Sequence, residues 1–292
     1  MKIVLFGKYG QLGWELCRTL APLGEVTAID RDDLDLQNTT ALENFLRAEK
    51  PQVMVNASAY TAVDRAEQEE GLAFQINERA PGVMAEMACT LRAAMIHFST
   101  DYVFDGRLGR PYVESDAPNP LNVYGRSKLA GEQAVQQAGA AALIFRTAWV
   151  YSLRGDSFVT KILEWARTNP ELRVVDDQVS NPTWARMLAE TTALVLARAG
   201  MDVHAYCEAR RGLYHLAGSG FASRFEWAKQ ILEADPNRSR QLVRSIQPAR
   251  TDEFPAPAVR PLFSALDCSH FEKTFDLRLP PWEQAFLRAM EG

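Results

Sequence analysis

A tyrosine and a lysine four residues apart are the side chains of this sequence best suited to do chemistry. They are Tyr124 and Lys128, in a segment that reads NVYGRSKLAGE over residues 122–132. Residues at i and i+4 of a helix share a face, so the phenol and the ammonium would point into one site. A tyrosine that exchanges a proton near neutral pH needs its pKa of about 10 lowered by roughly 3 units, which a nearby cation can supply. Two surface side chains one helical turn apart would show the same spacing, so the surrounding elements must decide.

Composition and charge narrow the class of protein. The chain has 292 residues, 47% of them hydrophobic, which is enough to bury a large core in one domain or two unequal lobes. Its formal net charge of -5, without a block of basic residues, argues against nucleic acid as a partner, because phosphate backbones are bound by clustered Lys and Arg. This charge still allows a small anionic substrate.

The cysteines, the histidines and the apolar runs together predict a cytoplasmic protein. The four cysteines and four histidines are scattered without metal-ligand spacing, so we expect reduced cysteines and no metal site built from them. The apolar start of the chain reaches Gly7 after a few residues and lacks the features of a signal peptide. No apolar run approaches the length of a membrane span, so no membrane segment is expected.

The elements that must position the tyrosine and the lysine form an alternating pattern of strands and helices. This alternation predicts a parallel sheet with helices on both faces, and right-handed crossovers make it a doubly wound, Rossmann-like α/β fold. Strands are expected at residues 2–6, 25–30, 52–56, 94–98 and 142–147, and helices at 14–20, 40–49 and 67–89, the last with a break near Pro81.

The pattern loosens beyond Tyr151. We predict that residues 1–150 form a dinucleotide-binding domain and that residues 151–292 form mainly a smaller substrate-binding lobe. Elements at about 172–217 are expected to return in part to the main sheet. Local patterns predict helices at 157–168 and 184–199 and strands at 172–175 and 213–216.

A glycine-rich turn follows the first predicted strand. The segment from Gly7 to Gly13 reads GKYGQLG, a Gly-x-x-Gly-x-x-Gly variant of the dinucleotide fingerprint. Because it opens the first helix, free backbone N–H groups and the positive helix end can face a pyrophosphate where glycine allows a close approach. Asp30, at the end of the second strand, could bind an adenosine ribose, whereas Arg31 beside it could pair with a 2′-phosphate. The choice between NADH and NADPH therefore stays open.

A Ser-Thr-Asp segment ends another predicted strand. Ser99, Thr100 and Asp101 fall at a carboxyl end, where folds of this kind bind their ligands. A hydroxyl there can donate a hydrogen bond to a carbonyl oxygen as hydride arrives. The same three residues would also suit a turn and a helix cap.

With these motifs in this order, the sequence resembles the extended short-chain dehydrogenase/reductase superfamily and, within it, the dTDP-4-dehydrorhamnose reductase family. The superfamily's Ser/Thr, Tyr and Lys triad corresponds to Thr100, Tyr124 and Lys128. The resemblance runs nearly end to end. It rests on LFGKYGQLGWEL (5–16), YTAVDRAE (60–67), STDYVFDG (99–106), LNVYGRSKLAGE (121–132) and IFRTAWVY (144–151), and on the later segments 176–178, 182–183, 212–216 and 260–267.

The resemblance implies a role for each member of the triad. Tyr124 would donate the proton, Lys128 would bind the nicotinamide ribose and lower the Tyr124 pKa, and Thr100 would tune the hydrogen bond to the substrate. Thr100, Asp101, Tyr124 and Trp149 would contact the deoxysugar, although Trp149 also suits a core position at a strand end. The implied reaction transfers hydride from NADPH or NADH to C4 of dTDP-4-dehydro-L-rhamnose, giving dTDP-L-rhamnose for cell-surface polysaccharide.

The resemblance also implies a set of binding residues beyond the triad. Some relatives bind Mg²⁺ at a dimer contact, and Glu15 and Glu190 are the candidate ligands by position, so Mg²⁺ and a homodimer are included among the expectations. Arg250 and Arg260 are candidates for the thymine and diphosphate groups. The expected cofactor-binding residues are Gly7, Gly10, Gln11, Leu12, Gly13, Asp30, Arg31, Asp35, Leu36, Ala59, Tyr60, Thr61, Tyr124 and Lys128.

Two departures and two rival functions accompany the resemblance. Ala148 stands where relatives carry serine, which removes one hydroxyl near the sugar, and Asn181 stands where relatives often carry a small residue. A related sugar-nucleotide dehydratase or epimerase is the first rival, but a dehydratase needs an Asp-Glu pair after the threonine, and here Thr100 is followed by Asp101 and Tyr102. The second rival is a non-catalytic nucleotide-binding regulatory subunit.

Overall fold

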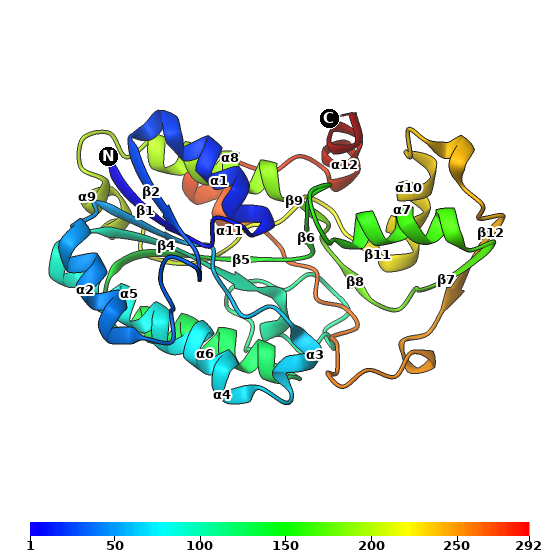
Figure 1. Ribbon diagram of the computed structural model, residues 1–292, viewed down its shortest axis with the longest axis horizontal. Coiled ribbons are helices and arrows are strands. Elements are labelled where there is room, and N and C mark those ends of the chain that lie inside the picture. Colours follow the sequence, from blue (N-terminus) through cyan, green and yellow to red (C-terminus); the bar gives the residue numbers. More distant parts are fainter. Residues whose placement is uncertain (292) are drawn as a thin grey trace.

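Six parallel strands form the sheet that runs through the larger part of the molecule (Figure 1). The structure, a computed structural model, describes residues 1–291. The strand order is β10-β5-β4-β3-β1-β2 with every neighbouring pair parallel, which confirms the predicted doubly wound, Rossmann-like α/β fold. The strands are β1 (Lys2–Phe6), β2 (Glu25–Ile29), β3 (Val53–Asn56), β4 (Ala94–Thr100), β5 (Ala141–Thr147) and β10 (Gly212–His215).

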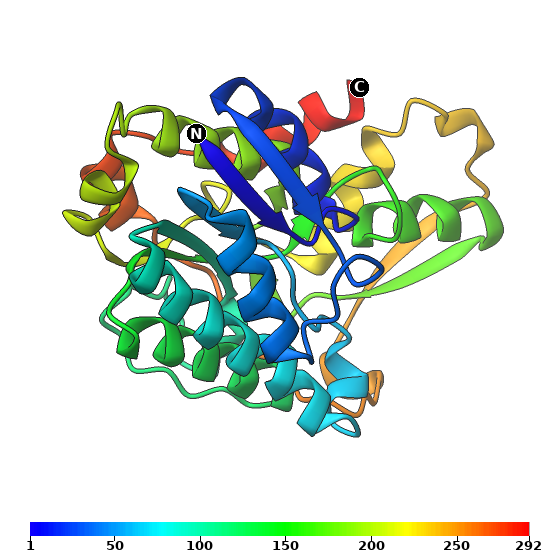
Figure 2. The same ribbon diagram turned by 60° about the vertical axis from the view of Figure 1, so that its left-hand side comes forward.

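Helices cover both faces of the sheet, because its central strands bury side chains on both sides. Figure 2 shows the same two layers of helices from a second direction. One layer consists of α1 (Gln11–Leu20), α8 (Ala185–Ala197), α9 (Val203–Glu208) and α11 (Ser269–Phe275). The opposite layer consists of α2 (Thr39–Glu49), α5 (Ala80–Leu91) and α6 (Val123–Gln137).

The predicted helix break near Pro81 is wrong. The chain stays helical through this residue, from α4 (Glu70–Phe74) through a π-helical turn at Gln75–Arg79 into α5. Proline lacks the N–H that would bond back to the preceding turn, and the wider π turn just before Pro81 accommodates that missing bond. A separate short helix, α3 (Val63–Ala66), precedes α4.

The smaller lobe is built from short strands and three helices around its own apolar core (Figure 1). Trp227 and Phe286 are fully buried at the centre of this core. The helices are α7 (Phe158–Thr168), α10 (Arg224–Glu233) and α12 (Trp282–Glu291). The strand pairs are β6 (Val150–Tyr151) with β9 (Thr183–Trp184), β7 (Glu171–Val175) with β12 (Ser245–Ala249), and β8 (Val179–Ser180) with β11 (Ala222–Ser223).

Short 3-10 turns occur in both parts of the molecule, at Ala21–Leu23, Asp101–Val103, Arg238–Arg240 and Thr251–Glu253.

The chain crosses between the two parts more than once. Within the predicted returning region, α8, α9 and β10 pack on the main sheet, whereas β7, β8 and β9 pair inside the smaller lobe. The domain boundary near residue 150 stays a prediction. Over residues 1–291, no helix combines the length and the apolar character needed to cross a membrane.

A buried ion pair fastens α6 to the sheet. Arg146 on β5 donates two hydrogen bonds to the Glu132 carboxylate on α6, at 2.8 and 2.7 Å, and both side chains are 2% exposed. Ser99 on β4 donates a third bond to the same carboxylate at 2.5 Å. Two desolvated charges are tolerated only when they are paired and hydrogen-bonded in this way. The register of α6 against β4 and β5 is therefore set by one carboxylate.

Glu132→Gln should lower the free energy of unfolding by about 3–5 kcal/mol, because it leaves the Arg146 guanidinium buried without its counter-charge. Urea denaturation of the purified variant measures this loss. Glu43→Gln is the matched control, since it removes the acid of an exposed pair with Arg47 and should change stability by no more than about 1 kcal/mol. Equal stability of Glu132→Gln and the wild type would contradict the assigned role of the pair.

Candidate active site

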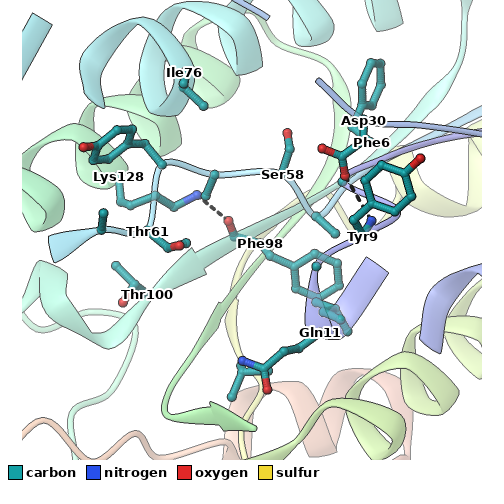
Figure 3. A pocket seen from close by; sticks show the side chains of 18 of the residues that line it. Phe6, Tyr9, Gln11, Asp30, Ser58, Thr61, Ile76, Phe98, Thr100 and Lys128 are labelled. Carbon is teal, nitrogen blue, oxygen red and sulfur yellow. Dashed lines mark hydrogen bonds between the residues drawn. The ribbon is translucent and has the colours of Figure 1, made fainter. Parts of the chain in front are cut away.

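A cavity of about 1050 Å³ opens at the carboxyl ends of the central strands (Figure 3). Its wall is shared by the glycine turn after β1, the ends of β2 to β5, the first turns of α6, and the segment that follows β5. The ends of neighbouring parallel strands meet at one edge of the sheet, which is why residues far apart in sequence line one space. The volume suits a dinucleotide together with part of a second ligand.

The glycine turn is shaped to bring backbone close to a ligand. Gly7 has a φ of +91°, and a Cβ there would lie 2.8 to 2.9 Å from the backbone of Ala57 and Ser58. A Cβ on Gly13 would lie 1.8 Å from the Gly7 carbonyl oxygen, so neither position accepts a side chain. Gly10 is the N-cap of α1 and brings no side chain to the helix end. The first N–H groups of α1 therefore face the cavity unobstructed, which fits a pyrophosphate.

Asp30 holds the glycine turn against the end of β2. One of its carboxylate oxygens accepts the backbone N–H of Tyr9 at 3.0 Å (Figure 3). The other accepts the backbone N–H of Arg31 at 2.8 Å. Lys8 is bound to Asp33 at 2.6 Å, whereas the side chain of Arg31 is 88% exposed. Of the cations around Asp30, Arg31 is thus the freer to meet a ligand.

Helix α6 carries Tyr124 and Lys128, and its start is held from three sides. The side chain of Asn122 accepts the Gly125 N–H at 2.8 Å, which is an N-cap bond. Glu67, from the loop after α3, accepts the Val123 N–H at 2.8 Å. A Cβ on Gly125 would lie 2.2 Å from the Tyr102 carbonyl oxygen, so glycine is needed for the close contact. The helix presents both functional side chains to the cavity.

Lys128 is almost completely buried, and its ammonium donates a hydrogen bond to the Phe98 carbonyl oxygen at 2.7 Å (Figure 3). Desolvation lowers the pKa of Lys128 from 10.5 to about 8, although the nearby Glu132 acts in the opposite direction. Among residues 1–291, no carboxylate lies within 4.0 Å of this ammonium. Because this pKa is still above neutral pH, Lys128 stays mostly charged there.

In the protein without ligands, Lys128 does not lower the Tyr124 pKa as expected. Burial raises the pKa of Tyr124 above its ordinary value, and only the Thr100 hydroxyl acts in the opposite direction. Lys128 is not among the groups that shift this pKa, and Asp101 and Tyr102 add to the rise. Tyr124 is consequently a neutral phenol, which is the form a proton donor needs.

Asp101 is bound by hydroxyl groups from three parts of the chain. Ser180 and Ser264 donate to one carboxylate oxygen at 3.0 and 2.5 Å, and Thr100 donates to the other at 3.2 Å. Burial raises the Asp101 pKa, while these hydroxyl groups oppose the rise. The carboxylate joins the strand end to β8 and to the loop that carries Ser264, a role that sequence reasoning missed.

Trp149 lines the cavity from an unusual backbone conformation. Its φ is +40°, in the left-handed region that non-glycine residues rarely adopt. Its indole stacks on Trp227 with ring centroids 5.7 Å apart, and the Arg224 guanidinium carbon lies 3.6 Å from its ring centroid. Nothing in the sequence near residue 224 indicates that α10 packs against Trp149.

The cavity brings together the predicted triad, the predicted sugar contacts and all but one of the predicted cofactor residues. Gly13 is the exception, since it lies beneath the turn against Gly7. Arg250 and Arg260 do not line the cavity and are paired with Asp177 and Asp64. The roles of these residues stay predictions. The lining includes Gly7, Gly10, Gln11, Leu12, Asp30, Arg31, Asp35, Leu36, Ala59, Tyr60, Thr61, Thr100, Asp101, Tyr124, Lys128 and Trp149.

The two glutamates considered for Mg²⁺ do not form a metal site by themselves. Glu15 on α1 pairs with the Arg186 guanidinium on α8 at 3.4 Å, and Glu190 lies one turn further along α8. A guanidinium beside the carboxylate already neutralises it and repels a divalent cation. In the part of the chain that the structure describes, no group of three or more His, Cys, Asp or Glu side chains could hold a metal ion. Within one chain, these residues therefore do not form a Mg²⁺ site.

Comparisons with known proteins agree with this geometry. The sequence model of the RmlD substrate binding domain family matches residues 1–291. The chain belongs to this family. A dTDP-4-dehydrorhamnose reductase from Burkholderia thailandensis is 41% identical over 98% of this chain and 96% of its own length. These findings confirm the family resemblance read from the motifs.

Solved structures of the family share the whole fold. A dTDP-4-dehydrorhamnose reductase from Clostridium acetobutylicum has a TM-score of 0.90 and 34% identity, covering 100% of this chain and 99% of its own. Another from Bacillus anthracis, solved in complex with NADP, has a TM-score of 0.87 and 31% identity, covering 100% of this chain and 98% of its own.

The two departures from the family pattern lie in different surroundings. Asn181 is buried away from the cavity, where its amide donates to the carbonyl oxygens of Gly218 and Gly220 and its oxygen accepts the Leu266 N–H at 2.7 Å. It is a structural link between loops. Ala148 does line the cavity beside Trp149, so the position of the missing hydroxyl borders the cavity.

The stability of the wild type should rise relative to Lys128→Met as pH increases from about 8 to 10.5. In this window the unfolded state binds the Lys128 proton and the folded state does not, so raising the pH favours the folded wild type. The difference between the two free energies of unfolding should shift by about 3 kcal/mol. Urea denaturation at several pH values measures this shift.

Lys161→Met, at an exposed lysine of α7, is the matched control and should differ from the wild type by the same amount at every pH. A difference between wild type and Lys128→Met that does not vary with pH would contradict the desolvation of Lys128. The shift with pH is the readout, because the variant also loses the bond to the Phe98 carbonyl.

Proposed function

We propose that this chain reduces the C4 ketone of dTDP-4-dehydro-L-rhamnose to dTDP-L-rhamnose, using hydride from a reduced nicotinamide dinucleotide. The observation that carries the proposal is the meeting of Thr100, Tyr124 and Lys128 in a cavity whose other end is the glycine turn. The relatives named dTDP-4-dehydrorhamnose reductase, which match nearly the whole chain, support the same activity. The product would serve the synthesis of cell-surface polysaccharide.

The residues of the chain have separate tasks in this reaction. A bound reduced nicotinamide would supply the hydride. Tyr124, held as a neutral phenol by its burial, donates a proton to the ketone oxygen as negative charge develops there. The Thr100 hydroxyl, which now points to Asp101, donates a second hydrogen bond to the same oxygen. Lys128 stays charged at neutral pH and binds ribose hydroxyl groups beside the Phe98 carbonyl.

The residues that line the cavity give little support to the rival functions. A 4,6-dehydratase needs a further acid/base pair, and the described lining residues include aspartates but no glutamate. Asp101 is also held by three hydroxyl groups, which leaves it poorly placed to move a proton. A regulatory subunit would not need Tyr124, Thr100 and Lys128 at one site. Simple reduction therefore accounts for more of the residues.

Several features of the proposal rest on the sequence alone. A cytoplasmic location, a homodimer and the division into a dinucleotide-binding part up to about residue 150 and a mainly substrate-binding part after it are kept as predictions. Mg²⁺ has no step in the proposal, because Glu15 is already paired with Arg186. For the cofactor, both NADPH and NADH are expected to serve, since Asp30 and the exposed Arg31 are both available at the end of β2.

Tyr124→Phe should lower kcat by at least about a hundredfold, because general acid catalysis contributes that much or more, while cofactor affinity stays nearly unchanged. The loss of absorbance of NADPH in the presence of dTDP-4-dehydrorhamnose measures the rate. Tyr206→Phe, on α9 and outside the cavity, is the control and should keep full activity. Absence of turnover in the wild type with both NADPH and NADH would rule out the reductase, and an unchanged kcat in Tyr124→Phe would remove the tyrosine from its role.

Arg31→Ala should raise the KM for NADPH about fivefold and leave the KM for NADH unchanged. The reason is that one exposed ion pair to a 2′-phosphate is worth up to about 1 kcal/mol, and NADH has no such phosphate. Arg240→Ala, at an exposed arginine of the smaller lobe, should change neither constant. If Arg31→Ala raises both constants equally, Arg31 does not read the 2′-phosphate.

A further inference from the structure

The β6–α7 loop, residues 152–157, joins the smaller lobe to the start of α1 (Figure 1). Its first residue, Ser152, donates its backbone N–H to the side-chain oxygen of Gln11, the first residue of α1, at 2.6 Å. Its last residue, Ser157, caps α7 and donates its hydroxyl to the Ser152 carbonyl oxygen at 2.9 Å. The loop is therefore fixed at both ends and lies against the helix whose first residues line the cavity.

Arg154 is the cation of this loop, and it lines the cavity. Its guanidinium carbon lies 3.3 Å from the ring centroid of Trp14 on α1, which is stacking distance. Among residues 1–291, its side chain donates no hydrogen bond, and no carboxylate lies within 4.0 Å of it. Asp156 of the same loop also lines the cavity but forms no ion pair with it. The indole thus holds the guanidinium while its N–H groups stay free for a ligand.

The charges along the cavity wall leave one task without a cation. In the part of the chain that the structure describes, three full cations line the cavity: Arg31, Lys128 and Arg154. Arg31 lies beyond the end of β2, on the side of Asp30, and Lys128 lies on α6 beside Tyr124. A pyrophosphate carries a full negative charge on each phosphate, whereas the start of α1 offers only about half an elementary charge. Arg154 is the cation attached to that end of α1.

We propose that Arg154 binds the pyrophosphate of the dinucleotide, so that the β6–α7 loop clamps the cofactor against the glycine turn. The inference rests on the proposed function, because it takes the ligand at the glycine turn to be a nicotinamide dinucleotide. A guanidinium fork binds phosphate oxygens in pairs, and Trp14 is a positioning residue that holds this fork at the helix end. The cofactor thereby connects the main sheet, which carries the glycine turn, with a loop that leads into the smaller lobe.

The test is the affinity for NADPH and for NADH, measured without substrate by the fluorescence of the reduced nicotinamide on the purified full chain. Arg154→Gln should weaken the binding of both cofactors about tenfold, because both carry the same pyrophosphate. This result differs from the one expected for Arg31→Ala, which should affect NADPH alone. Raising the ionic strength should shrink the difference between the wild type and Arg154→Gln, since salt screens an exposed charge pair.

Two further variants separate the charge from its support. Trp14→Leu keeps the cation but removes the ring that holds it, so it should weaken both cofactors, and by less than Arg154→Gln does. Arg154→Lys keeps the charge without the fork and should fall between the wild type and Arg154→Gln. Arg210→Gln is the matched control, since Arg210 lies over the ring of Tyr206 at 4.1 Å, outside the cavity. It should bind both cofactors like the wild type.

Three results in a folded Arg154→Gln would each overturn the proposal. They are an unchanged affinity for both cofactors, a loss confined to NADPH, and a loss that does not vary with ionic strength. The last of these would assign Arg154 a packing role on Trp14 instead of a bond to phosphate. The unfolding midpoint of each variant reports whether it is folded.

These measurements separate the clamp from the reaction, because cofactor binding needs no turnover. A wild type that binds NADPH through Arg154 but does not oxidise it with dTDP-4-dehydrorhamnose would contradict the proposed function and keep the clamp. A wild type that turns over, with cofactor affinity indifferent to Arg154, would contradict the clamp alone. A wild type that binds neither cofactor would overturn both.

Discussion

The buried pairing of Glu132 with Arg146 is the interaction on which the rest of the site depends. It lies on the same helix as Tyr124 and Lys128 and joins that helix to β5, while Ser99 joins it to β4. One helical turn separates Glu132 from Lys128, so the pairing fixes where the ammonium and, another turn back, the phenol come to lie. A helix held only by apolar contacts could slide along the sheet, whereas a desolvated ion pair tolerates little displacement.

Three buried or partly buried cations of the molecule differ in the groups that compensate their charge. Arg146 is neutralised by a carboxylate and serves structure. Lys128 donates only to a carbonyl oxygen, and its burial lowers its pKa. Arg224 has only aromatic rings around it, and its charge is the least compensated of the three.

Much of the site could be read from the sequence because local chemistry determined it. The glycine turn needs glycine wherever a Cβ would collide with neighbouring backbone, and that requirement is visible as the spacing of Gly7 and Gly13. Tyr124 and Lys128 share a helix, so their common face follows from the helical repeat. Thr100 could be placed because it closely follows a run of mostly apolar residues in β4. Periodicity also gave most strands and helices, but it missed the π turn before Pro81, where α6 packs against Asn77.

By itself the sequence determined the fold class, the order of its elements, the family and three residues, Thr100, Tyr124 and Lys128, that line the cavity. Only the tertiary structure decided how their charges are balanced. The direction of the Tyr124 pKa depends on burial, which comes from contacts between distant segments. The same holds for Asp101, whose hydroxyl partners include Ser180 of β8 and Ser264, and for Arg224, which reaches Trp149 from α10. Spacing along a chain specifies a shared face of a helix, whereas desolvation and charge pairing arise only when separate elements pack together.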